Sequence, residues 1–219
     1  MLIGLRVTGL VAILTCVALA AGCKATDKSI ERKETAVASL QTVRGEITRA
    51  DKQIDTTLLA MRDLEKTDSK DSLKRRFDRY VNALSRLQSD VKQLNDRTND
   101  LDKRAATYLS AWEQETSQIS NVKLQEIATK RRTSVQSSLN RFRAEMDATR
   151  AAYRPLLSEL LDIQTFLASE LTPGSVKAAS DVFHKAEEDA GLVHQRVQQV
   201  LTELDGLITA LSQSPAPKS

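Results

Sequence analysis

The amino-acid sequence predicts an all-α fold: an elongated antiparallel up-down bundle of four long helices that follows an N-terminal signal peptide. Two observations lead to this class. Apolar residues recur at alternating steps of three and four, which is the seam of coiled-coil-like heptad packing. Residues that interrupt helices are also scarce beyond residue 30, where the glycines and prolines are Gly45, Pro155, Pro173, Gly174, Gly191, Gly206, Pro215 and Pro217.

The signal peptide is expected over residues 1–22. Arg6 supplies a positive charge near its start, and the run from Val7 to Gly22 has no charged side chain. The exit Leu19-Ala20-Ala21-Gly22-Cys23 resembles the lipobox of bacterial lipoproteins, which are cut before a cysteine that receives acyl chains, although Ala20 stands where leucine is usual. The alternative is an uncleaved membrane anchor, because the apolar run approaches the ~20 residues that span a bilayer.

This pattern predicts that Cys23 carries the lipid (diacylglycerol and palmitate-like chains) and that residues 23–29 form a linker to the bundle. Cys16 lies within the signal peptide, so no other thiol is left in the mature chain for disulfides, metals or catalysis. Lys24 follows the cysteine in place of the aspartate that retains some lipoproteins at the inner membrane. We therefore expect a location at the outer membrane, facing the periplasm.

Turn-forming sequences divide residues 30–212 into four helices and leave a disordered tail at 213–219. The turns are TDSK at 67–70, with Ser69 as the N-cap, SQISN at 117–121 and TPGS at 172–175. The four helices are therefore expected at 30–66, 70–117, 121–171 and 174–212. The segment SQISN contains neither glycine nor proline, so the alternative is that the second and third helices are continuous. Pro155 falls inside the third helix, but the apolar spacing continues on both sides of it, which predicts a continuous, kinked helix.

The seams are nearly unbroken. In the last helix the three-four step lands only on apolar residues, namely Val176, Ala179, Phe183, Ala186, Ala190, Val193, Val197, Val200, Leu204, Leu207 and Leu211. The other seams hold with few polar interruptions, among them Thr57, Thr98 and Thr149. We expect these threonines at three different heights of the bundle, so they form no shared polar site. Additional apolar residues beside each seam favour four helices over a two-stranded coiled coil.

With these positions in view, the chain resembles the bacterial family called domain of unknown function 2959, which is described as probable lipoproteins. The resemblance covers most of the mature chain. It rests on Trp112-Glu113, Ser120-Asn121, Pro155-Leu156-Leu157, Asp162, Phe166-Leu167 and Leu171. The chain departs from the family at Ala168–Thr172, where the family usually has a Lys-His-Asn-Leu-Asn stretch. The resemblance implies the fold and the location, and no activity.

Motifs for catalysis and for cofactors do not occur in the sequence. There is no glycine-rich phosphate loop, no H-E-x-x-H and no cysteine cluster, and His184 and His194 lie ten residues apart without a Glu-x-x-His pattern. We therefore expect no enzyme, no cofactor, no metal and no nucleotide. The net charge is only +3, and the basic runs at 74–76 and 130–132 lie close to acidic residues, which favours solvated helix faces over nucleic-acid binding.

The junction of the second and third helices is the candidate contact site. The second helix is expected to be about ten residues longer than the first, so the tip should project ~15 Å past the other helices, at the same end as Cys23. Aromatic, aliphatic and basic residues on this tip suit a membrane or partner contact: Tyr108, Trp112, Leu124, Ile127, Lys130 and Arg131. The alternative is a closed hairpin in which the two helices simply pack together.

The expected function is a structural or adaptor role in the bacterial cell envelope, with a lipid anchor in the membrane and an envelope protein as partner. The alternative is a module that contacts the membrane surface or peptidoglycan. The sequence leaves the oligomeric state open.

Overall fold

The computed structural model describes residues 18–66 and 72–213, with side chains from residue 29 onward. Over these ranges the fold is all-α, as the sequence predicts, and contains no strand. Its elements are α1 (Ala18–Arg62), the 3-10 turn η1 (Asp63–Glu65), α2 (Leu73–Ser117), α3 (Val122–Ser169), the short α4 (Pro173–Ala178) and α5 (Ser180–Ser212).

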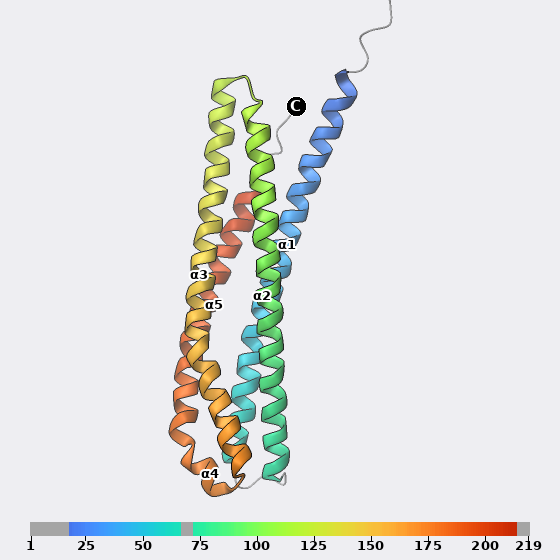
Figure 1. The fold of residues 1–219 in the computed structure, drawn as a ribbon. Helices are drawn as coiled ribbons and strands as arrows, with labels where there is room; N and C mark the ends of the chain where they lie inside the picture. Colours follow the sequence, from blue (N-terminus) through green and yellow to red (C-terminus); the bar gives the residue numbers. More distant parts are fainter. Residues whose placement is uncertain (1–17, 67–71, 214–219) are drawn as a thin grey trace, which may run out of the picture.

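The four long helices run antiparallel to their neighbours and form an elongated bundle (Figure 1). Helix α1 packs beside α2, α2 beside α3, α3 beside α5, and α5 closes the ring against α1. The short connections explain this up-down order, because a brief turn can only return the chain alongside the helix that it has just left.

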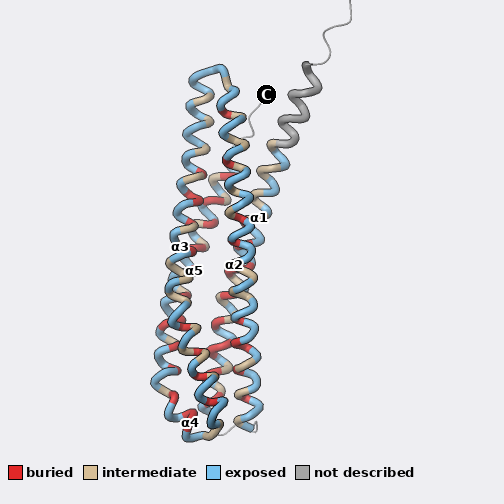
Figure 2. The backbone as a smooth tube through the Cα atoms, viewed as in Figure 1, coloured by how far each residue is buried: buried red, intermediate tan, exposed pale blue. Residues whose placement is uncertain are grey.

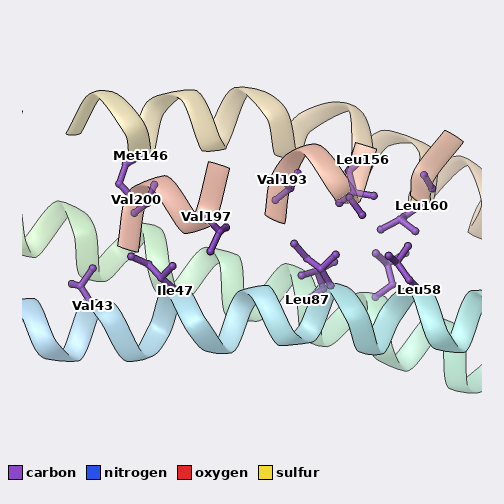
Figure 3. Close-up of a cluster of buried hydrophobic side chains, with 14 of the residues drawn as sticks. Val43, Ile47, Leu58, Leu87, Met146, Leu156, Leu160, Val193, Val197 and Val200 are labelled. Atoms are coloured by element: carbon purple, nitrogen blue, oxygen red, sulfur yellow. The ribbon is translucent and has the colours of Figure 1, made fainter. Parts of the chain in front are cut away.

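The core is a column of apolar side chains along the bundle axis (Figures 2 and 3). Figure 3 shows Val43 and Ile47 of α1 opposite Met146 of α3 and Val200 of α5. Each such side chain stabilises the fold by about 1.5–3 kcal/mol when it is fully buried. The described core runs from Leu40 to Leu211, so a chain that begins at residue 24 contains all of it.

Helix N-termini are capped by side chains, as the turn sequences indicate. The Asn121 carboxamide oxygen accepts a hydrogen bond from the Leu124 amide at 3.1 Å, and the Thr172 hydroxyl accepts one from the Ser175 amide at 3.1 Å. The cap of α2 is Ser72, whose hydroxyl accepts from the Arg75 amide at 3.4 Å. The predicted cap, Ser69, lies outside the described residues, and α2 begins at Leu73 instead of 70.

Helix α1 begins earlier than the sequence predicted. It is helical from Ala18, so residues 23–29, which were expected to form a linker, belong to the helix. The segment from Cys23 to Ile30 contains neither proline nor glycine, so nothing in it interrupts a helix. The backbone of Cys23 is thus part of α1, while its side chain lies outside the described part of the chain.

The fourth predicted helix is divided in two. The cap at Thr172 and Pro173 start α4, but the helix is interrupted at Ala179, whose amide donates to the carbonyls of both Ser175 and Val176 at 3.1 Å. Helix α4 contacts η1 and covers the end of the core opposite the α2–α3 junction (Figure 1). Both Val176 and Ala179 remain buried, so the seam continues across the break.

Helix α3 is continuous through Pro155, which confirms that part of the prediction. The Pro155 side chain is exposed, and the next residue, Leu156, is fully buried. The helix therefore keeps its apolar seam although one backbone hydrogen bond is lost at the proline.

Part of the predicted signal peptide, residues 1–17, and residues 214–219 of the predicted disordered tail lie outside the described residues. Among the residues that are described, no helix combines the length and the apolar character needed to span a bilayer.

Candidate functional site

The α2–α3 hairpin extends past the end of α5 (Figure 1). Leu109 of α2 and Val135 of α3 line the same crevice as Leu211, at the last turn of α5. We call the part of the hairpin beyond this level, residues 110–134, the tip. The rise from Leu109 to Ser117 corresponds to about 12 Å, close to the ~15 Å expected from the sequence.

Helix α1 runs beside the tip, which corrects the expectation that two helices stand there alone. The Arg32 guanidinium of α1 forms an ion pair with the Glu115 carboxylate near the end of α2. The ammonium of the next residue, Lys33, donates to the carbonyl of Ser212 at 2.9 Å, where a positive charge is favourable at the C-terminus of α5. The tip therefore outreaches α5 and does not outreach α1, because α1 starts well before residue 30.

The first turns of α3 expose aliphatic side chains. Val122 is 68% exposed, Leu124 56% and Ile127 42%, although the apolar seam of the same helix is well buried from Val135 onward. We call these three residues the tip patch. Figure 2 shows that exposed residues dominate the tip, whereas buried residues follow the inner faces lower in the bundle. Helices α2 and α3 pack together as a hairpin, as the alternative expects, and these three side chains stay exposed on its surface.

Leu124 and Ile127 of the tip patch lie on helical rows of α3 that contact α5 lower in the bundle. The row of Val122 leads instead to Arg143, which pairs with Asp102 of α2. Two heptads along from Ile127 is Arg141, whose Nε lies 3.0 Å from Glu203 Oε2 of α5. Three heptads along from Leu124 is Glu145, whose Oε2 lies 3.8 Å from Arg196 Nη1 of α5. Because residues one heptad apart share a face in such a bundle, Leu124 and Ile127 lie where α5 would pack if it continued.

Tyr108 and Trp112, the two aromatic residues of the predicted contact set, are half-buried, whereas the sequence predicts that they face solvent. The rings of Tyr108 and Trp112 meet edge to face with centroids 5.7 Å apart, and both pack against the core. Burial raises the pKa of Tyr108; the Arg32 guanidinium opposes this shift and the Glu115 carboxylate adds to it. Tyr108 thus belongs to the α1–α2 side, and the structure does not join it to Leu124 and Ile127 in one surface.

The predicted basic residues flank the tip patch. Lys130 and Arg131 are exposed, and within the described part of the chain neither forms an ion pair. Arg132 differs, because its guanidinium contacts Glu113 Oε1 of α2 at 3.1 Å and closes the hairpin. Of the first basic run, Arg76 is buried, so the expectation of a solvated face is wrong at this residue.

Polar groups elsewhere in the bundle serve packing. Thr57, Thr98 and Thr149 each donate to the carbonyl four residues earlier, at 2.8 Å, and so satisfy themselves within their own helices. His194 of α5 contacts Asp51 at 2.7 Å and Asp55 at 3.2 Å, which joins α5 to α1. In the ranges with described side chains, no group of three or more potential ligands is placed to hold a metal ion.

The fold and the tip define a class: a long helical-bundle protein with a protruding hairpin. The chain belongs to the family described as "Protein of unknown function (DUF2959)", whose model matches residues 24–211. This confirms the resemblance found in the sequence. No curated protein and no solved structure matches the chain.

Proposed function

We propose that the chain is a lipid-anchored lipoprotein of the bacterial cell envelope that binds a partner protein through its tip. Acyl chains on Cys23 would hold it in the outer membrane, facing the periplasm. The lipobox-like exit before Cys23 supports the anchor, and the family match begins at the next residue, Lys24. We assign the chain no catalytic role.

The observation that carries the adaptor role is the continuation of the α3–α5 interface beyond the end of α5. Leu124 is exposed, although Ser138 and Glu145 on the same row are buried or half-buried lower in the bundle. Ile127 lies on the adjoining row, where the Arg141–Glu203 ion pair marks the edge of the α3–α5 interface. An amphipathic helix in line with α5 would cover Leu124 and Ile127 with the same packing geometry that the chain already uses. The proposed occupant is therefore a helix of a partner protein.

The charges near the patch specify this helix further. Lower in the bundle, α5 places Glu203 opposite Arg141. Arg131 lies nearer the tip, on the same heptad row as Leu124, and forms no ion pair among the described residues. We therefore expect the partner helix to carry acidic residues beside its apolar face. A patch of this size gives a weak complex by itself, so tethering of both proteins to one membrane would raise their effective concentration.

A membrane-surface or peptidoglycan contact is the alternative function. The position of Cys23 in α1, on the same end of the bundle as the tip, favours a membrane contact. The half-buried state of Tyr108 and Trp112 weighs against it, because interfacial aromatic residues usually stand free in the headgroup region.

A photo-crosslinking amino acid in place of Leu124 tests the proposal in cells. The matched control is the same amino acid in place of Leu59, which is 59% exposed on α1 but lies far from the tip. The crosslinked products are digested and sequenced by mass spectrometry.

The proposal expects one protein at position 124 and not at position 59, crosslinked through a segment with heptad spacing. The substitution Ile127→Glu should reduce this product strongly, because it places a charge in the apolar contact. Crosslinks to lipid alone would support the alternative function and contradict the adaptor role. Equal products at both positions would also contradict it.

A further inference from the structure

A groove of about 480 Å³ opens between α1 and α2 near the end of the bundle that carries Cys23. Its walls include Arg32 and Ala36 of α1 and Lys103, Arg104 and Tyr108 of α2. Figure 1 shows why it exists: α1 diverges from α2 towards this end. The volume lies within the range of roughly 300–1,000 Å³ that is typical of small-molecule sites.

The floor of the groove leads into an apolar crevice of about 40 Å³ inside the bundle. Ala36, Ser39, Arg104 and Tyr108 line both spaces, and the crevice continues to Leu207 and Leu211 of α5. The space results from the sequence, because both seam positions of this layer, Ala36 and Ala105, carry the smallest apolar side chain. An apolar space of this kind is not stabilised by water and favours an apolar occupant.

The mouth of the groove is positively charged. Arg32, Lys103 and Arg104 oppose a single acidic residue, Glu31, among the charged groups of its lining. Arg32 is engaged by Glu115, whereas Lys103 and Arg104 have no ion-pair partner within the described part of the chain. Lys103 and Arg104 are thus two adjacent cations without an ion-pair partner among the described residues, and they lie next to an apolar crevice.

We propose that this groove binds an amphiphile with one acyl chain and an anionic head. Lys103 and Arg104 contact the head by charge-assisted hydrogen bonds. The tail lies between α1 and α2 along Ala36 and Tyr108, and its end enters the crevice beside Leu211. A carboxylate or a phosphate fits the head position equally well, so the shared chemistry is a monoacyl anion. The site is separate from the tip patch and does not depend on the proposed adaptor role.

Isothermal titration of the domain from residue 24, with Cys23 absent, tests this site. The probes are laurate, lauroyl lysophosphatidate and the zwitterionic lauroyl lysophosphatidylcholine, each below its critical micelle concentration. Arg104→Glu removes the head contact, and Ala36→Leu fills the crevice. Ala38→Leu, at an exposed position of α1, and Arg131→Glu, on the tip, are the matched controls. Circular dichroism checks that each variant remains helical.

The expected result is saturable binding of one anionic probe per chain, with at least about tenfold weaker binding by Arg104→Glu, since a charged hydrogen bond contributes about 1.5–3 kcal/mol. Ala36→Leu should also weaken binding, and both controls should leave it unchanged. Binding of only laurate or only lysophosphatidate identifies the head group. No saturable binding, equal binding of the zwitterionic probe, or full affinity in Arg104→Glu overturns the proposal. If Ala36→Leu loses its helical structure, Arg104→Glu decides alone.

Discussion

Arg141 of α3 and Glu203 of α5 form an ion pair at 3.0 Å, and this pair marks the edge of the interface between the two helices. Two heptads towards the tip, the heptad row of Arg141 carries Ile127, which is 42% exposed. At Ile127 the row has no partner on α5, because α5 ends at Ser212 while α3 extends further, to Val122. The proposed partner helix lies in line with α5 for this reason, and we expect it to carry acidic residues as α5 does at Glu203.

An extension of α5 should cover the tip patch within one chain. We expect that replacing the residues after Ser212 with two further heptads, with leucine at the seam positions, stabilises the domain by roughly 2 kcal/mol, or about 4–8 °C in Tm. The measurement is thermal unfolding followed by circular dichroism. The control is an extension of equal length made of glycine and serine. If both extensions give the same Tm, the patch does not accept a helix in line with α5.

Pro155→Ala should stabilise the domain. Pro155 is exposed inside the continuous helix α3, so its removal restores a backbone hydrogen bond without loss of core packing. Proline is about 3 kcal/mol worse than alanine inside a helix, and the greater freedom of the unfolded variant offsets about 1 kcal/mol of this. Thermal unfolding should show a rise of about 4–8 °C. A lower Tm would mean that the proline shapes α3 for its packing against α5.

Tyr80 and Tyr153 should respond differently to removal of the hydroxyl. The Tyr80 hydroxyl donates to the Leu160 carbonyl at 2.5 Å and joins α2 to α3, so Tyr80→Phe should cost about 1 kcal/mol at neutral pH. The Tyr153 hydroxyl is buried and finds no hydrogen-bond partner in the described structure, so Tyr153→Phe should be neutral or stabilising. Urea unfolding of both variants measures the difference. Equal losses would show that the Tyr153 hydroxyl is bonded after all.

Alkaline pH should destabilise the domain through the same two residues. Burial raises the pKa of Tyr153 to about 12 and also raises that of Tyr80 above its ordinary value of 10. A raised pKa means that the folded state holds the proton more tightly, so this contribution is complete below pH 10 and is lost as pH rises towards 12. The loss should be smaller in Tyr153→Phe than in the natural sequence, as measured by urea unfolding across this range. An identical pH dependence would contradict the assignment to Tyr153.

Glu159→Gln should stabilise the domain at pH 7. Burial raises the pKa of Glu159, and the neighbouring Asp189 carboxylate adds to the shift, while Lys185, 3.9 Å away, opposes it. A raised folded-state pKa contributes stability below the unfolded-state pKa of about 4.3, and this contribution is lost as pH rises through the folded-state value. The advantage of glutamine should therefore shrink towards pH 4. A variant less stable than the natural sequence at pH 7 would show that the Lys185 contact dominates.

The seam that runs through α4 and α5 was predictable from the sequence because it is apolar at every step, and all eleven of its positions from Val176 to Leu211 are buried. The place of the α2–α3 junction was predictable from its polar sequence, but a continuous helix could not be excluded there, because the segment lacks glycine and proline; in the structure the Asn121 side chain caps α3. The exposure of Leu124 and Ile127 followed from the relative lengths of the helices. The break at Ala179 was not predictable, because alanine favours helix and the seam passes through it.

The groove between α1 and α2 could not be located from the sequence. It depends on the divergence of α1, and the linker expected at 23–29 excluded a helix there. The only signal was the occurrence of alanine at seam positions 36 and 105, whose common height in the bundle is known only once α1 and α2 are placed side by side. The inward packing of Tyr108 and Trp112 also depends on this placement, because the sequence alone put both residues on a bare tip.

The most direct test of the proposed anchor is metabolic labelling with radioactive palmitate of bacterial cells that produce either the natural chain or Cys23→Ser. Palmitate can reach the chain at a cysteine only through Cys16 or Cys23, and the lipobox-like exit selects Cys23. The account predicts a labelled protein in the membrane fraction for the natural chain, and no label with loss from that fraction for Cys23→Ser. Unchanged labelling of Cys23→Ser, or a natural chain without label, would contradict it.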